Sequence, residues 1–87
     1  MILMLVRHKV ADFNAWKQVF DSHAEAQREA GLRVDRVLRN FDNPNEVFIL
    51  FEVTDVDKAR GFVSSPMVPQ VMKMAGVVDK PDIYFVS

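Results

Sequence analysis

The sequence has no cysteine, only three glycines and a net charge of -1. The absence of cysteine excludes a disulfide scaffold and thiolate chemistry. Three widely spaced glycines leave no glycine-rich loop of the kind that cradles a phosphate. The nearly balanced charge gives no electrostatic attraction for nucleic acid or an anionic membrane, and the longest apolar run, residues 1–6, is much shorter than a membrane-spanning helix. We therefore expect a cytoplasmic protein that binds neither nucleic acid nor membrane.

The chain is rich in apolar residues for its length. Its 87 residues are 49% hydrophobic and 26% charged, which is too apolar for a disordered segment. This length matches one globular domain, and we expect residues 1–87 to form it. A domain of this size buries a modest core, so a partner that covers more apolar surface would stabilise it.

The hydrophobic pattern predicts four strands and two helical regions. Unbroken or alternating apolar runs predict strands at residues 2–10, 32–39, 46–53 and 82–86. Apolar residues three or four positions apart predict a helix at 13–30 and a helix pair at 56–63 and 67–75.

Capping residues support these helix boundaries. Asp12 is expected to cap the first helix, and Gly31 is expected to end it. Thr54, three residues before Asp57, resembles a capping box for the second helical region. The Ser65-Pro66 pair is expected to start its second helix.

The order of elements predicts the fold. Two strand–helix–strand halves are the pattern of a ferredoxin-like α+β sandwich, βαββαβ, with a four-stranded antiparallel sheet. In this topology the first and third strands are central, and the helices cover one face. Both faces of these two strands are apolar, however, so the second face would be exposed in a monomer. We therefore expect a homodimer that packs sheet to sheet.

Two segments resemble a known family. They are RHKVADFNAWKQVFD and SPMVPQVMKMAGVVDKPDIYFVS. Both are similar to small members of the dimeric α/β-barrel superfamily, which includes the antibiotic-biosynthesis-monooxygenase-like proteins. The residues that carry the resemblance are Asp12, Trp16, Phe62, Ser65, Pro66, Ala75, Gly76, Val77 and Pro81. The resemblance implies a homodimer whose two sheets form a barrel, with a pocket between sheet and helices in each subunit.

The activities of this superfamily include oxygenation of aromatic polyketides or quinols without a cofactor, and haem degradation. The haem-degrading branch uses an Asn on the first strand, a Trp on the third and a His on the second helix. This sequence has none of these, since its one tryptophan is Trp16 in the first helix. Haem degradation is therefore disfavoured.

His8 is the candidate catalytic residue. It shares the strand face of Met4 and Val6, which we expect to point toward the helices. An imidazole in an apolar cleft can act as a general base on a phenolic or carbon-bound proton. The alternative is a histidine at a strand end that bonds to backbone or faces solvent.

Further candidates line the expected pocket. Trp16, Phe20 and Phe51 would form aromatic walls, and Met72 would add adaptable apolar surface, although all four are also ordinary core residues. His23 lies on the apolar stripe of the first helix, either as a second pocket group or as a boundary residue paired with an acid such as Glu52.

Three basic residues flank these candidates. Arg36 shares a strand face with Val34 and Leu38, so we expect it to hold an anionic group in the pocket or to bridge to an acid of a dimer partner. Arg7 and Lys9 are expected to be exposed charges at the rim of the sheet.

No metal site or organic cofactor is expected. His8 and His23 fall at opposite ends of the strand–helix unit, and no His spacing typical of a metal site is present. The sequence therefore predicts a small-molecule-binding protein, acting as a cofactor-independent monooxygenase or cyclase on an aromatic or enolisable substrate. The alternative is a non-catalytic ligand-binding or structural dimer module.

Overall fold

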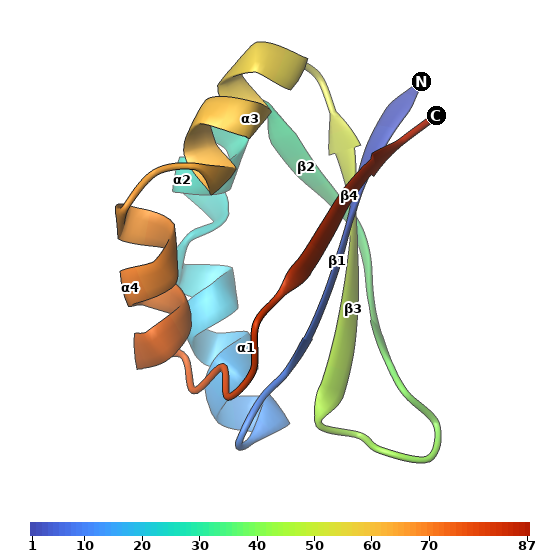
Figure 1. Cartoon of the computed structure of the whole chain (residues 1–87), viewed down its shortest axis with the longest axis vertical. Coiled ribbons are helices and arrows are strands. Elements are labelled where there is room, and N and C mark those ends of the chain that lie inside the picture. The colour runs from blue at the N-terminus through green and yellow to red at the C-terminus, as the bar shows by residue number, and fades with distance from the viewer.

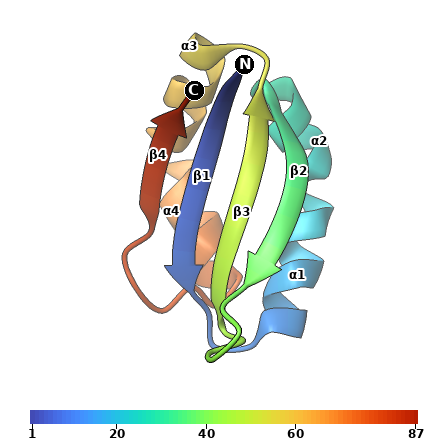
Figure 2. The same ribbon diagram turned by 90° about the vertical axis from the view of Figure 1, so that its right-hand side faces the viewer.

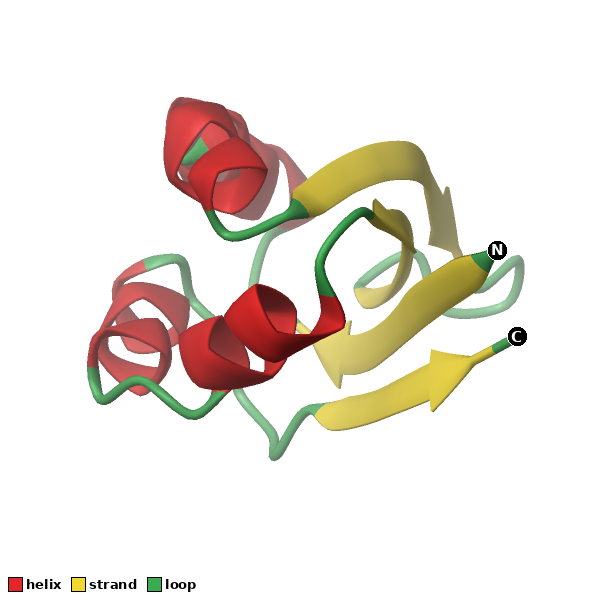
Figure 3. Ribbon diagram, turned by 90° about the horizontal axis from the view of Figure 1, so that it is seen from above, coloured by secondary structure: helices red, strands yellow, loops and turns green.

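The computed structural model describes residues 1–87 and has the predicted ferredoxin-like α+β fold (Figure 1). Its elements are β1 (Ile2–Lys9), α1 (Phe13–Ser22), α2 (Ala24–Glu29), β2 (Leu32–Arg39), β3 (Glu46–Val53), α3 (Val56–Val63), α4 (Met67–Met74) and β4 (Asp82–Val86). The antiparallel sheet has the order β2-β3-β1-β4, so β1 and β3 are central as expected (Figure 2). All four helices lie on one face of the sheet (Figures 1 and 3). None of them is long and apolar enough to cross a bilayer.

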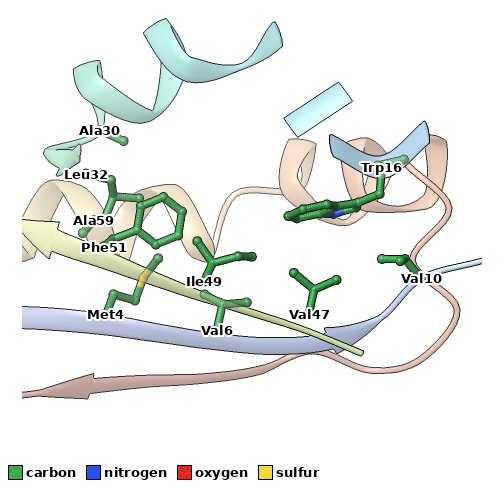
Figure 4. Packing of buried hydrophobic residues seen from close by; sticks show 11 residues of the cluster. Met4, Val6, Val10, Trp16, Ala30, Leu32, Val47, Ile49, Phe51 and Ala59 are labelled. Carbon is green, nitrogen blue, oxygen red and sulfur yellow. The ribbon is translucent and has the colours of Figure 1, made fainter. Parts of the chain in front are cut away.

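Strand register places the core on the helix side of the sheet. Along β1 and β3, alternate residues pair and are buried, including Met4 with Phe51 and Val6 with Ile49. These side chains point toward the helix layer, and Trp16 of α1 packs into the same core nearer Val47 (Figure 4). The residues between them face the open side of the sheet. This alternation places His8, opposite Val47, on the helix side as predicted.

The first helical region is two helices, not the single helix 13–30 that the spacing predicts. His23 separates α1 from α2, with φ -103° and ψ 15°. Its Nδ1 donates to the carbonyl of Val19 at 2.8 Å, and the Ser22 hydroxyl donates to the same oxygen at 2.6 Å. The backbone N–H of His23 therefore bonds to the carbonyl of Phe20 instead. Side chains that compete for a helical carbonyl in this way interrupt the helix.

The start of α1 agrees with the prediction, whereas the starts of α3 and α4 differ in which residue caps the helix. Asp12 caps α1 as expected, since its carboxylate accepts from the N–H of Ala15 at 3.1 Å. The cap of α3 is Asp55, and Thr54 instead donates through its N–H and hydroxyl to the carbonyl of Gly31. At α4 the N-cap is Pro66 rather than Ser65 and the helix begins at Met67, although the Ser65 hydroxyl accepts from the N–H of Met67 at 3.2 Å.

A β-bulge in β2 changes the face of the sheet to which the later side chains of that strand point. Val34 pairs with Phe51, but Arg36 pairs with Leu50, so one residue of β2 is left over between them. The strand alternation changes phase at this point. Val37, rather than Arg36, then lies on the helix side.

Gly31 is required at the turn between α2 and β2. Its φ is 77°, and a Cβ at this position would lie 3.1 Å from Asp55 atoms. Gly31→Ala is therefore expected to lower the free energy of unfolding by about 1–2 kcal/mol. Gly61→Ala is the matched control, because Gly61 lies in α3 with open space around it, and it should stabilise by about 0.5–1 kcal/mol. Urea denaturation measures both, and equal effects would contradict the argument.

Candidate functional site

A cavity of about 100 Å³ lies between the sheet and the helices. Of its 20 lining residues 17 are hydrophobic, and the remaining three are His8, His23 and Gln27, so no charged side chain borders it. Six of the predicted site residues meet here: His8, Trp16, Phe20, His23, Phe51 and Met72. The cavity therefore favours uncharged, mainly apolar ligands.

His8 is buried without a hydrogen-bond partner. Its side chain is 2% exposed, and neither Nδ1 nor Nε2 has a partner. The ring meets Trp16 edge to face, with centroids 5.5 Å apart and planes at 76°. A buried polar group without a partner costs about 1–3 kcal/mol, so a cavity occupant that bonds to His8 would recover this energy. The two alternatives for His8, backbone bonding or exposure, do not occur.

The environment of His8 sets its protonation state. Burial lowers the pKa of His8 to about 4, while the charge of Asp79 opposes this shift and the charge of Arg7 adds to it. The imidazole is therefore neutral at neutral pH, with one ring nitrogen that carries a proton and one that carries a lone pair.

This pKa shift makes stability depend on pH. As pH falls, the unfolded chain protonates His8 near its ordinary pKa, while the folded chain remains neutral until about pH 4. Between about pH 7.5 and pH 5, His8 should therefore remove about 2 kcal/mol of unfolding free energy. Denaturant titrations across this range should show the loss in wild type and in His23→Gln, but not in His8→Leu. An equally steep loss in His8→Leu would show that His8 is not its source.

A row of aromatic rings forms one wall of the cavity. Trp16 stacks on Phe20 with centroids 4.8 Å apart, and Phe20 approaches Phe51 at 6.1 Å. Phe13 extends the row, 5.7 Å from Trp16. Because this row runs from α1 onto β3, it presents aromatic surface from both layers.

One ring nitrogen of His23 has a backbone partner. A carbonyl oxygen only accepts, so the 2.8 Å contact with Val19 means that Nδ1 carries a proton. The expected alternative partner, Glu52, is 3.8 Å from Arg33 on the open side of the sheet. His23 therefore lines the cavity and does not pair with Glu52.

Gln27 is a cavity residue that the sequence reasoning missed. Its side chain is 7% exposed, and its Oε1 is buried without a partner. The available signal was its spacing, because Gln27 follows His23 by four residues on the same helical stripe.

Arg36 is not a pocket residue. The bulge in β2 turns it to the open side of the sheet, where its side chain is 63% exposed and its nearest acid is Asp35 at 3.5 Å. The expectation that it anchors an anion in the pocket is therefore wrong. The alternative, a bridge to an acid of a dimer partner, stays open.

Arg7 is not the free rim charge that the sequence suggested. It donates to Glu46 at 2.7 Å, and to Asp79 and Asp82 at 2.9 Å each. These contacts raise the pKa of Arg7. Asp79 also accepts from the N–H of Lys9 at 2.8 Å. Although burial opposes it, these donors hold the pKa of Asp79 below its usual value. The cluster joins β1, β3 and β4 next to His8 and so helps to position it.

No group of three or more His, Asp or Glu side chains lies close enough to hold a metal ion. No model of a known protein family matches the chain, and no curated protein matches it by sequence.

Solved structures share the fold along the full chain. SnoaB, a cofactor-independent oxygenase from Streptomyces nogalater, is 19% identical with a TM-score of 0.71, covering 99% of this chain and 90% of that one. A Bordetella bronchiseptica protein, provisionally assigned as an antibiotic biosynthesis monooxygenase, is 14% identical with a TM-score of 0.78 and coverages of 99% and 94%. A conserved protein from Methanosarcina mazei Go1 is 14% identical, with a TM-score of 0.72 and coverages of 98% and 89%. The expected resemblance is confirmed at the level of the fold.

Proposed function

We propose that this protein binds an aromatic or enolisable small molecule in the cavity and acts on it as a cofactor-independent monooxygenase or cyclase. The observation that carries the proposal is His8, a buried neutral imidazole with two free ring nitrogens in an apolar cavity. The similarity in fold to SnoaB supports the same kind of chemistry.

In this proposal His8 accepts the proton of a phenol or enol. The resulting anion is an electron-rich carbon nucleophile that reduces O₂. One oxygen atom bonds to a ring carbon, that carbon loses its hydrogen as a proton, and the second oxygen leaves as water with this proton and the one that His8 returns. The substrate supplies all the electrons, so phenol and O₂ yield quinone and water.

The charge on the substrate assists this transfer. A phenolate or enolate beside His8 attracts the protonated imidazole. This attraction raises the pKa of His8 above the low value that burial alone gives it. The apolar walls strengthen that attraction because they exclude water. Acidic substrates such as naphthols or diketones fit best, since the proton transfer then costs least.

Oxygen uptake tests this function. The protein is mixed with a panel of naphthols and diketones in the presence of a chelator, with isotopically labelled O₂. We expect protein-dependent uptake with one substrate consumed per O₂ and one labelled oxygen in the product. If no member of the panel reacts faster than it does without protein, the non-catalytic ligand-binding module is the better description.

We further propose that the protein is a homodimer in which two sheets pack face to face as a barrel. The open side of the sheet carries apolar side chains from all four strands: Leu3, Leu5, Leu38, Phe48, Leu50, Tyr84 and Val86. This side has no covering layer within the chain (Figure 2), and burying it would stabilise the pair. Arg36, whose side chain is 63% exposed beside Asp35, lies on the same side, where it can reach an acid of the partner.

A further inference from the structure

The cavity contains two buried side chains with polar atoms that lack partners. His8 is 2% exposed with both ring nitrogens free, and Gln27 is 7% exposed with Oε1 free. Both line the same cavity. Two uncompensated polar groups in an apolar core are costly, which points to an occupant that bonds to both.

The two groups lie at opposite ends of the cavity. Gln27 borders a surface hollow beside Leu32 and Val34, which lie in register with Ile2 and Met4 of β1. These two residues precede His8 by six and four positions, so at about 3.3 Å per strand residue this end of the sheet is roughly 13–20 Å from His8. Allowing about 2.8 Å for a hydrogen bond at each end leaves roughly 7–14 Å between the two polar atoms of an occupant.

Two aromatic rings joined end to end have about this length. We propose that the cavity takes an elongated, uncharged two-ring aromatic molecule that carries an oxygen at each end, one bonded to His8 and the other to Gln27. This inference rests on the proposed function and adds the shape and substitution pattern of the substrate.

The lining agrees with this class of ligand. No charged residue borders the cavity, which disfavours carboxylates and phosphates. The row formed by Trp16, Phe20 and Phe51 supplies aromatic surface for both rings. The Gln27 amide can accept from a hydroxyl or, turned over, donate to a carbonyl, so the distal oxygen can be of either kind.

The cavity must widen to hold such a ligand. Its volume of about 100 Å³ is below the roughly 150 Å³ of an apolar cavity that holds benzene. Met67 and Met72 border it from α4. Their unbranched side chains can change conformation at little cost, so we expect them to move when two rings enter.

Three probes test the inference by titration calorimetry on the wild-type protein. They are p,p′-biphenol with a hydroxyl at each end, p-phenylphenol with one hydroxyl, and biphenyl with none. We expect the biphenol to bind about tenfold more tightly than the phenylphenol, because it also satisfies the second buried group. In Gln27→Leu this advantage should disappear, and in Gln18→Leu, the same change at an exposed position of α1, it should remain.

The outcomes separate the inference from the proposed function. Equal binding of biphenol and phenylphenol by wild type overturns the two-ended site while leaving the proposed function intact. A tenfold advantage that persists in Gln27→Leu also overturns the assignment of Gln27. If none of the three probes binds, the small-molecule site itself fails. The comparison within wild type does not depend on any variant, and Gln27→Met replaces Gln27→Leu if the latter does not fold.

Discussion

His8→Ala is expected to lower turnover of an oxygenated substrate at least a hundredfold, which is the lower end of what a positioned general base contributes. The reason is geometric as well as chemical. His8 carries the only buried, unpartnered ring nitrogens that line the cavity, and no charged group borders the cavity that could accept the proton instead. Steady-state oxygen uptake measures the effect.

Chemical rescue distinguishes loss of the base from loss of structure. His8→Ala leaves a space beside Trp16 of the size of an imidazole ring. Free imidazole added to the variant should therefore restore part of the turnover, with a dependence on pH that follows the added base. Unchanged turnover in His8→Ala, or a loss that imidazole does not relieve although the variant is folded, would show that His8 is not the base.

Leu5→Glu is expected to convert the proposed dimer to a monomer and to raise its dissociation constant at least a hundredfold. Leu5 lies on the open side of central strand β1, between Leu50 and Tyr84. In a two-fold dimer the substitution occurs twice at the interface, and each unpaired buried charge costs about 3–5 kcal/mol. In a single chain the same glutamate would be hydrated, so the fold should survive, as circular dichroism can verify.

Mass measurement at micromolar concentration gives the outcome. Wild type should have twice the chain mass of 10.0 kDa, and Leu5→Glu should have 10.0 kDa. Met74→Glu is the matched control, because Met74 is 79% exposed on α4 in the helix layer and should leave the dimer intact. A wild-type mass of 10.0 kDa would contradict the sheet-to-sheet dimer.

Most of the fold could be predicted because it depends on local patterns. The bounds of β2, β3 and β4 follow from alternation and from neighbouring turn residues. The bulge in β2 could not be predicted, because no residue type at Asp35 requires it, and it moved Arg36 to the opposite face. The break at His23 arises from its own side chain competing for the carbonyl of Val19, which apolar spacing does not reveal.

The candidate site was predictable where it depends on strand parity. His8 was placed on the helix side because it alternates with Met4 and Val6, and β1 has no bulge to reverse it. Gln27 was missed as a site residue because a polar side chain on an apolar stripe gives no indication of whether its amide finds a partner. The contact of Arg7 with Asp79 joins residues 72 positions apart, and only the tertiary structure reveals such pairs.

The most direct test of the site is nuclear magnetic resonance of protein with isotopically labelled histidine rings, with p-phenylphenol as the probe. The His23→Gln variant assigns the signals of the two histidines. We expect His8 to be neutral at neutral pH and its ring-nitrogen signals to shift as the probe saturates the cavity. Ring-nitrogen signals of His8 that stay unchanged at saturating probe, or that show a protonated ring at neutral pH, would contradict a ligand site built around this buried imidazole.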